Sequence, residues 1–455
     1  MKKRNGWVRK SAIREIKKGD RGIVDLMMVM NHFFRQLPEW IGEMTDPRHP
    51  SYIVYTQTDL VYMGLLKNMC GLKTMHGMDE MFNEAECIRT LKILSGDSGL
   101  EEMPHCDTLN YYLERLSPKC LSELRKKMVK NLIRMKSFGR ARLLGKYWRI
   151  ILDGTGLFYF KERHCENCLV STVTKEDGTK EKTYYHKVLE AKLVLGDKIV
   201  LSIDTEFIEN ESENVTKQDC EINAAKRLLE RLAGDYKRLP VCIQGDSLYA
   251  VEPVMRLCRK KHWRYVFTHK ESRQKLLGES YDWIKQGGGV TEKAGICPEK
   301  GTGEYINHVD ETAGKEETAN IFCYTYETEE KGEKKTVTFS WLTDMELTVK
   351  NLEEMIMAAR GRWKIENEGF NSQKNGIYDI EHLNSHNSNA MKNHYLLTQV
   401  ADMIMQIYLA WNPLRKKAVQ TVKNTSSRLL ESFRRQTVTD EDVSYIQRYT
   451  TIYLE

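Results

Sequence analysis

The stretch YWRIILDGTGLFYF, residues 147–160, marks the point where the chain changes from helical to β-rich sequence. Two apolar runs flank the segment DGTG, and we expect them to form β structure interrupted by a glycine-rich turn. The next stretch, HKVLEAKLVLGDKIVLSIDTEFI at residues 186–208, predicts two strands joined at Gly196-Asp197. Three consecutive strands therefore open this part of the chain as a meander.

Helical and β-rich segments alternate after this meander. Apolar residues recur at helical spacing over 216–234 and over 251–263, and a short buried strand running into Asp246 separates these helices. RYVFTHK at residues 264–270 adds another strand. We interpret Asp219 and Glu221 as structural, because acidic residues in the first turns of a helix favour its dipole. The order of the segments predicts an α/β domain.

The regions that flank this α/β domain have a different character. Residues 1–145 show helical periodicity, whereas 270–340 alternate short β-like runs with glycine-rich and charged turns, which predicts a β-rich insertion. The chain then returns to helix as far as its last residue. We therefore divide it into a helical N-terminal domain, the first part of the core, the insertion, the closing helix of the core and a helical C-terminal region, at 1–145, 146–269, 270–340, 341–390 and 391–455.

Basic residues are unevenly distributed along the 455-residue chain, whose formal net charge is +6. Residues 1–21 contain nine Lys or Arg against two acids, and residues 125–149 contain ten basic residues and no acid. Such runs favour a polyanionic partner, since Lys and Arg neutralise nucleic-acid phosphates, but they also occur on solvated helix faces. If they contact DNA, the helical N-terminal domain is the DNA-contacting part of the chain.

Hydrophobic segments and cysteines indicate the compartment. No run approaches the roughly 18 apolar residues that span a bilayer, so we expect a soluble, cytoplasmic protein without a membrane partner. Eleven cysteines at irregular spacing favour reduced thiols. In RHCENCL, the residues His164, Cys165 and Cys168 could begin a zinc site, but no second ligand pair follows at matching spacing. Whether they bind metal stays open.

Three carboxylates stand at informative positions. Asp153 and Asp246 each follow an apolar run, and Glu366 lies in GRWKIENEGFNSQKNG, residues 361–376, which we expect to be a helix. Taken singly, each position is ordinary turn or surface chemistry. Taken together, two strand ends and one helix predict an oxygen-rich, negatively charged cluster. Mg²⁺ or Mn²⁺ suits that set of ligands.

The segments ILDGTGL, IQGDSLYA and RWKIENEGFN resemble the three acidic motifs of DDE transposases from bacterial insertion sequences. The carboxylates are separated by 93 and 120 positions, and the long second interval is similar to that of relatives whose core is interrupted by a β-rich insertion. The resemblance covers roughly residues 147–382. It implies a ribonuclease-H-like mixed sheet core with a β-rich insertion, preceded by a helical N-terminal domain and followed by a helical C-terminal region.

The resemblance also implies the catalytic residues and their metal. Asp153, Asp246 and Glu366 correspond to the triad that binds two Mg²⁺ or Mn²⁺ ions for in-line phosphoryl transfer. With water as the nucleophile, such a site cuts DNA at the ends of the element, and with the freed 3′-hydroxyl it joins that end to target DNA. Glu368 competes for the acidic role. We prefer Glu366, because it lies four residues after Arg362 on one helical face.

Two positions of the expected helix depart from the family pattern. Ala359 replaces a tyrosine, and Gln373 stands where a lysine is expected, with Lys374 one step away. Trp363 either fills the core or stacks on an unpaired base, and we favour the core. The expected DNA contacts come from basic residues on this helix and near the other two motifs: Arg362, Lys374, Lys217, Arg259 and Lys260.

The partners and the competing functions follow from the same resemblance. A transposase acts on double-stranded DNA at element ends and target, and bringing two ends together implies a homodimer when DNA is bound. A bacterial transposase is expected in the cytoplasm, at the nucleoid. Two alternatives remain at this point: a metal-dependent nuclease of the same fold that cuts without joining, and a domesticated DNA-binding protein without catalysis. The presence of all three acids argues against the latter.

Overall fold

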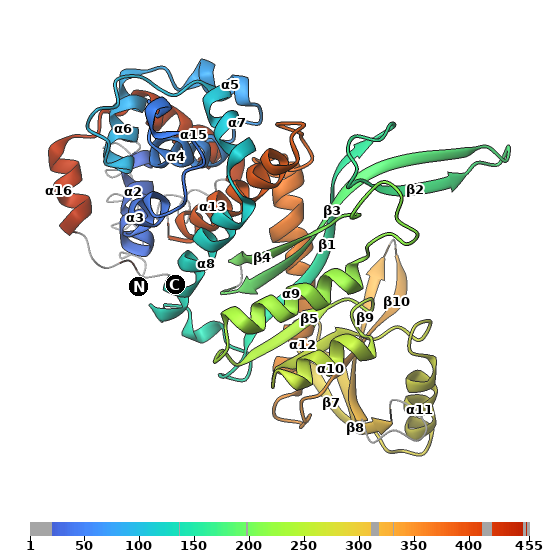
Figure 1. Cartoon of the computed structure of the whole chain (residues 1–455). Coiled ribbons are helices and arrows are strands. Elements are labelled where there is room, and N and C mark those ends of the chain that lie inside the picture. Colours follow the sequence, from blue (N-terminus) through green and yellow to red (C-terminus); the bar gives the residue numbers. More distant parts are fainter. Residues whose placement is uncertain are drawn as a thin grey trace, which may run out of the picture. The chain divides into compact units, whose positions relative to one another are not determined.

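The computed structural model describes residues 21–135, 137–196, 199–310, 318–330, 332–411, 421–448 and 452 (Figure 1). These residues divide into two compact units. A helical unit comprises 1–138, 201–203 and 368–455, and a sheet unit comprises 139–200 and 204–367. The basic stretch predicted at residues 1–21 lies outside the described residues except for Arg21.

Helices from both ends of the chain form the helical unit. They are α2 (Gly22–Phe34), α3 (Leu37–Gly42), η1 (Pro50–Tyr52), α4 (Gln57–Met69), α5 (Met75–Met81), α6 (Ala85–Ser95), α7 (Cys106–Arg115), α8 (Pro118–Arg134), α13 (Ser388–Trp411), α15 (Val422–Arg435) and α16 (Asp440–Arg448). Helix α13 packs against α2, α4, α7 and α8, and its side chains from 393 to 409 are all buried. A helix that is buried on every side must be central to its unit.

Helix α4 shows how the sequence shapes this core. Thr56 and Asp59 form a capping box at its start, which satisfies backbone donors that a helix leaves unpaired. Gly64 lets α4 approach α13 closely, because a Cβ at this position would lie 2.4 Å from the Cδ2 atom of Leu397. The absence of a side chain at Gly64 is therefore a packing requirement.

A ten-stranded sheet, as far as the structure is described, dominates the other unit. Its order is β2-β3-β1-β5-β6-β10-β9-β8-β7, and β4 also pairs with β3. The bounds are β1 (Trp148–Phe160), β2 (Leu169–Thr174), β3 (Lys180–Val194), β4 (Val200–Ile208), β5 (Val241–Gly245), β6 (Arg264–Thr268), β7 (Thr291–Ile296), β8 (Gly301–Asp310), β9 (Thr318–Glu330) and β10 (Glu333–Thr343). Pairing is parallel between β1 and β5 and between β5 and β6. The architecture is thus mixed α/β.

Strand β1 corrects the predicted glycine-rich turn. It runs without interruption from Trp148 to Phe160, so Asp153 lies inside a strand and not at the end of one. Gly154 and Gly156 both pair with β3, and the irregularity comes later, as a register shift between Gly156 and Tyr159. Glycine weakens a strand and favours bulges without ending it, which the local pattern does not reveal. Strand β2 was not predicted from the sequence either.

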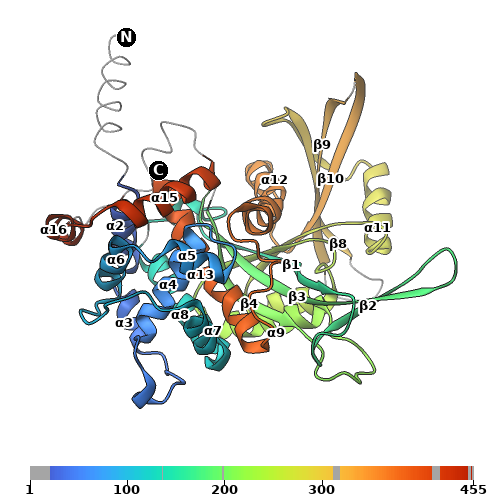
Figure 2. The same cartoon turned by 90° about the horizontal axis from the view of Figure 1, so that it is seen from above.

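Helices cover both faces of this sheet. Figure 2 shows the sheet between α9 (Glu221–Asp235) on one side and α12 (Leu352–Arg360) on the other. Helix α10 (Glu252–Lys260) packs beside α9, and α11 (Lys275–Gln286) packs on β8. The α12 side forms a core with aromatic residues of β9 and β10, among them Phe322 and Trp341. The predicted β-rich insertion therefore contains a helix and continues the main sheet.

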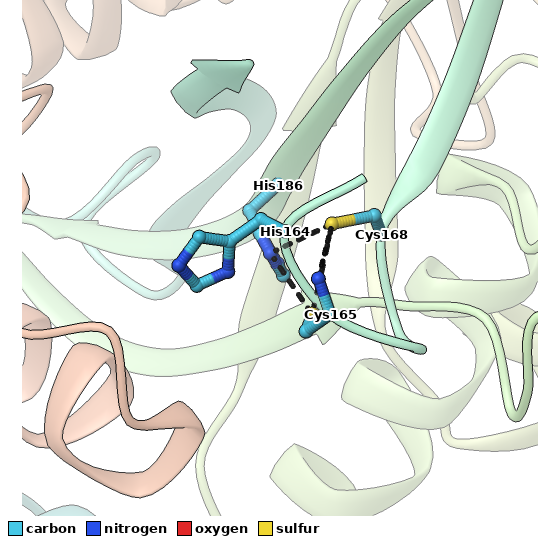
Figure 3. A group of neighbouring side chains, drawn as sticks. All are labelled: His164, Cys165, Cys168 and His186. Carbon is cyan, nitrogen blue, oxygen red and sulfur yellow. Dashed lines mark hydrogen bonds between the residues drawn. The ribbon is translucent and has the colours of Figure 1, made fainter. Parts of the chain in front are cut away.

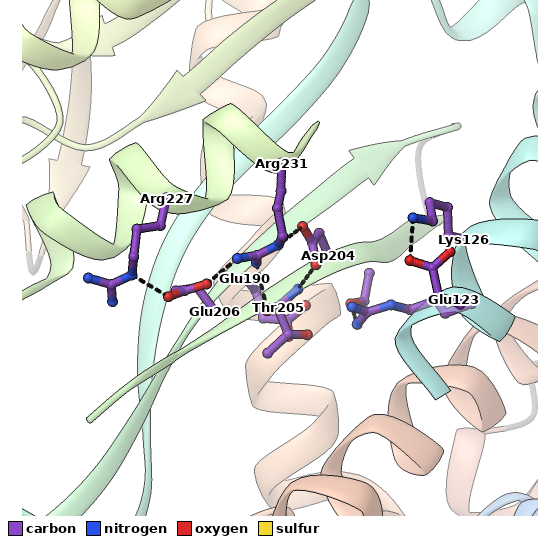
Figure 4. A network of polar contacts seen from close by, with 10 residues as sticks. Glu123, Lys126, Glu190, Asp204, Thr205, Glu206, Arg227 and Arg231 are labelled. Carbon is purple, nitrogen blue, oxygen red and sulfur yellow. Dashed lines mark hydrogen bonds and ion pairs between the residues drawn. The ribbon is translucent and has the colours of Figure 1, made fainter. Parts of the chain in front are cut away.

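A network of ion pairs links α9 to residues within β4 (Figure 4). Arg231 Nε lies 3.0 Å from Asp204 Oδ2, and Arg231 also pairs with Glu206. Arg227 pairs with the same Glu206 at 2.5 Å and with Asp219 at 2.6 Å. Several partly buried charges that share partners hold geometry better than one exposed pair does. The network fixes the start of α9, where Glu221 lies.

The segment expected as one closing helix changes its hydrogen-bonding pattern along its length. Helix α12 is followed by a 3₁₀ turn, η3 (Gly361–Trp363), and then by a π-helix, η4 (Ile365–Gly376). The division between the two units falls after Asn367, inside η4. Apolar periodicity does not separate α from π geometry, and π segments are rare but frequent at functional sites.

Two further expectations bear on the compartment. Within the described ranges, no helix combines the length and the apolar character that a bilayer crossing requires. All eleven cysteines are free thiols, as the irregular spacing predicted.

Candidate active site

Asp153 lies in β1, and Asp246 lies just past the end of β5, the strand that pairs in parallel with β1. The last residues paired in this register are Ile151 and Gln244, which stand two positions before Asp153 and Asp246. Neighbouring strands are about 4.8 Å apart. Asp246 directly follows β5 and accepts a hydrogen bond of 2.8 Å from the amide of Leu248. This bond fixes the turn that presents the Asp246 carboxylate.

Arg362 connects the third carboxylate to the first. Its Nη1 atom lies 3.4 Å from Glu366 Oε1 and 4.0 Å from Asp153 Oδ2. The Asp153 and Arg362 side chains are mostly buried, whereas that of Glu366 is 56% exposed. The closing segment thus brings Glu366 to β1 across more than 200 positions of sequence.

The pKa of Asp153 depends on both of the other carboxylates. Burial raises its pKa from 3.8 to about 7, and the negative charges of Glu366 and Asp246 add to that rise. The guanidinium of Arg362 and the amide of Gly154, which donates a 2.9 Å hydrogen bond, act in the opposite direction. A carboxyl whose pKa is raised by burial and, in addition, by neighbouring carboxylates is typical of a site that takes a cation.

Glu221, whose position in the first turn of a helix indicated a structural role, is a fourth acidic residue at this site. The Tyr249 hydroxyl donates a 2.8 Å hydrogen bond to Glu221 Oε2, and Lys187 pairs with Oε1. Burial and then the charges of Glu221, Asp153 and Asp246 raise the pKa of Tyr249. A Cβ on Gly154 would lie 2.4 Å from Glu221 Oε2. In the sequence, the one feature that indicated this close approach of Glu221 is the glycine at position 154, directly after Asp153.

Other residues of the closing segment differ from expectation. Trp363 is 56% exposed, so the prediction that it fills the core is wrong. Gln373 is fully buried in the helical unit, where its amide donates to Gln399 at 2.9 Å and to Asp402 at 2.8 Å. A lysine at that position would replace a satisfied amide network, which accounts for the departure from the family pattern. The side chain of Glu368 lies outside the described residues.

The predicted DNA-contacting residues occupy different environments. Lys217 and Lys260 are exposed. Arg259 pairs with Glu252 at 3.1 Å, and Lys374 pairs with Glu381 at 2.6 Å. In the basic stretch 125–149, Arg125 is buried and donates to Ser202 at 2.7 Å, so it faces the core and not solvent.

The structure also completes the group that begins with His164. Cys165 and Cys168 meet His186 of β3, 18 residues beyond Cys168, in addition to their neighbour His164. No ligand pair at zinc-finger spacing marks this partner in the sequence. The pairing of β2 with β3, in which Leu169 is opposite Tyr185, brings Cys168 near His186.

Fold and site define a mixed α/β protein with a partly buried cluster of acidic residues suited to a divalent cation. The family model described as "Transposase DDE domain" matches residues 144–401, which is more than half of the chain, so the chain belongs to this family. The protein is therefore a DNA transposase, and enzymes of this family generally use divalent metals.

Comparison with individual proteins adds little to this assignment. The chain is similar to a solved structure titled "Cryo-EM structure of piggyBac transposase synaptic complex with hairpin DNA", with a TM-score of 0.42 and 12% identity over 93% of this chain and 84% of that one. No curated protein matches the sequence.

Proposed function

We propose that the protein cuts DNA at the ends of a bacterial insertion sequence and joins the freed 3′-hydroxyl to target DNA. Asp153, Asp246 and Glu366 are the catalytic and metal-binding residues in this proposal. The observation that carries it is the shared electrostatics of the three side chains, since Glu366 and Asp246 both raise the pKa of Asp153. Residues far apart in sequence interact in this way only where the fold has brought their charges together.

The residues present fit divalent cations. The donor set consists of carboxylate oxygens, one of them mostly buried, and hard cations such as Mg²⁺ or Mn²⁺ prefer oxygen ligands. Bound cations would remove the like-charge repulsion around Asp153, and this gain in free energy favours their binding. Two bound ions supply a deprotonated nucleophile and compensate charge on the leaving oxygen during in-line displacement.

Residues of the chain orient the carboxylates and the DNA. Arg362 lies between Asp153 and Glu366, and its guanidinium would bind a phosphate if bound cations neutralised the two carboxylates. The exposed indole of Trp363 lies next to it in the chain and offers a stacking surface for an unpaired base. Lys217, Lys260, Arg259 and Lys374 supply further backbone contacts, the last two after exchanging their carboxylate partners for phosphate.

The fold proposal follows the strand order. Strand β4 pairs with β3, β3 is antiparallel to β1, and β1, β5 and β6 are parallel. This order supports a ribonuclease-H-like core in which β1 and the end of β5 present the two aspartates. The segment from β7 to β10 corresponds to the insertion that separates Asp246 from Glu366. We also propose that two copies assemble on paired DNA ends in the cytoplasm, because joining requires both ends at once.

The test measures cutting and joining separately, on DNA that carries the ends of the element. Asp153→Asn, Asp246→Asn and Glu366→Gln should each lower both activities by at least about 100-fold, since each removes a ligand of the reacting centre. DNA binding should change little. Glu368→Gln is the matched control for Glu366→Gln and should remain active.

Each of the other outcomes identifies a different error. Cutting without joining by the unmodified protein would favour the nuclease, and absence of both activities with intact binding would favour the domesticated protein. Full activity of Glu366→Gln together with an inactive Glu368→Gln would assign the third carboxylate to Glu368.

A further inference from the structure

A second group of potential ligands lies in the sheet unit, in the loop between β1 and β2 and on β3 (Figure 3). The ligand atoms of the four side chains all lie within 4.8 Å of one another, and the residues are His164, Cys165, Cys168 and His186. Cys168 and His186 are buried, and the other two are partly buried. These residues share no member with the carboxylate site.

The distances match the edges of a tetrahedron around zinc. With Zn–S bonds of about 2.3 Å and Zn–N bonds of about 2.05 Å, tetrahedral angles place two sulfurs about 3.8 Å apart and a sulfur and a nitrogen about 3.6 Å apart. The Sγ atoms of Cys165 and Cys168 are 3.6 Å apart, and each lies 3.5 Å from His186 Nε2. Three ligand atoms thus already have the spacing that one ion requires.

Backbone and side-chain hydrogen bonds hold the loop in this shape. The amide of Cys165 points to Cys168 Sγ at 3.4 Å, an arrangement that stabilises a thiolate. Asn210 donates to the carbonyl of Cys168 at 2.9 Å, and Asn167 donates to the carbonyl of Asn210 at 2.9 Å. The ring of His164 stacks on Phe160, with centroids 4.5 Å apart. Hydrogen bonds around the cysteines and the stacking of His164 therefore preorganise the loop for binding an ion.

The outer surroundings of His186 fit the same interpretation. Its Nδ1 atom faces Glu209 Oε1 at 4.0 Å, while Nε2 faces the two sulfurs. Histidines that bind metal through one nitrogen commonly direct the other toward a carboxylate, which fixes the orientation of the ring. This division of roles between the two nitrogens leaves Nε2 as the ligand atom.

We propose that His164, Cys165, Cys168 and His186 bind one zinc ion as a structural site. Two thiolates and two imidazoles are the ligand set that selects Zn²⁺ over Mg²⁺, and both sulfurs and the Nε2 atom of His186 already have tetrahedral spacing. Four protein ligands leave no position for substrate, so the ion stabilises structure and takes no part in phosphoryl transfer. A disulfide is the competing interpretation, but sulfurs 3.6 Å apart are well beyond the bonded distance of about 2.05 Å.

The position of this site indicates which part of the structure the ion would stabilise. His186 lies on β3 between Lys187, opposite Gly156, and Tyr185, opposite Tyr159, so it faces the register shift in β1. Zinc would fasten the loop after β1 to β3 at the place where regular pairing is interrupted. Lys187, the next residue, carries the ammonium that pairs with Glu221. The zinc site therefore stabilises the strand pair that presents Asp153.

The experiment measures metal in the full chain, purified under reducing conditions without a polyhistidine tag. Elemental analysis should find about one zinc per chain. Cys165→Ser, Cys168→Ser and His186→Ala should each lose most of it, whereas Cys297→Ser, an exposed thiol outside the group, should retain it. Asp153→Asn should also retain zinc, which separates this site from the catalytic one.

A second measurement does not depend on the folding of variants. Replacing zinc by Co²⁺ in the unmodified protein should give the intense visible absorption of tetrahedral cobalt, with a thiolate charge-transfer band. Less than about 0.1 zinc per chain with no cobalt spectrum would overturn the proposal. So would loss of two titratable thiols in the freshly prepared protein, which would show a disulfide.

Discussion

At the scale of single residues, Asp153 shows how a buried carboxyl group costs stability. Its carboxyl is mostly buried, next to two other acidic side chains, and its pKa is raised from 3.8 to about 7. The folded state therefore binds a proton more tightly than the unfolded state does. In the absence of metal, this residue destabilises the fold increasingly as the pH rises from about 4 to about 7.

Asp153→Asn should therefore stabilise the metal-free protein at pH 8. Removal of a charge that the fold disfavours should raise the free energy of unfolding by on the order of 2 kcal/mol, and the gain should vanish toward pH 4. Thermal unfolding in a chelator across this pH range measures it. Addition of Mg²⁺ should reverse the order, since only the unmodified protein gains from binding. A variant less stable than the original at pH 8 without metal would contradict the charge argument.

At the scale of elements, most of the helices and strands of the sheet unit could be predicted from the sequence. The alternation of strands and helices from 147 to 270 and the placement of Asp246 directly after a buried strand both follow from local patterns. β1 did not, because a strand that continues through Gly154 and Gly156 depends on its neighbours β3 and β5. The roles of His186 and Glu221 were not predicted, for the same reason. Their roles arise from pairing and packing between segments that no local pattern connects.

The contact of α4 with α13 provides a test at this scale. Gly64→Ala should lower the melting temperature, because its Cβ would lie 2.4 Å from Leu397 Cδ2 in a closely packed interior. Overpacking of this kind typically costs about 1 to 3 kcal/mol. Gly42→Ala at the end of α3, where a Cβ meets nothing within 4 Å, is the matched control. Equal melting temperatures for the two variants would show that the Leu397 side chain moves aside and accommodates the added methyl group.

At the scale of the whole molecule, charge is concentrated at one end of the chain. The first twenty residues contain eight basic and two acidic residues, an excess of six that equals the formal net charge of the entire protein. The remainder of the chain is balanced. Attraction to DNA that is independent of sequence should therefore depend strongly on this short segment.

Removal of residues 1–20 should weaken binding to unrelated duplex DNA and make it less sensitive to salt. Each lost phosphate contact lowers the slope of log affinity against log salt by about 0.9. Fluorescence anisotropy between about 50 and 200 mM salt measures both quantities. Lys335→Ala, which removes an exposed lysine already paired with Glu330, provides the control. An unchanged slope would assign the affinity to other basic residues.

The junction of β6 and β10 determines how the chain can be divided. Leu342 pairs with Phe267, and its two neighbours pair likewise, so the segment between the second and third acidic motifs shares backbone hydrogen bonds with the core. Excising that segment would strip β6 of a partner and leave a bare row of amides and carbonyls, which recruits other chains. A segment that reads as a detachable insertion in the linear sequence therefore occupies, in three dimensions, a position next to β6 that would otherwise be an open sheet edge.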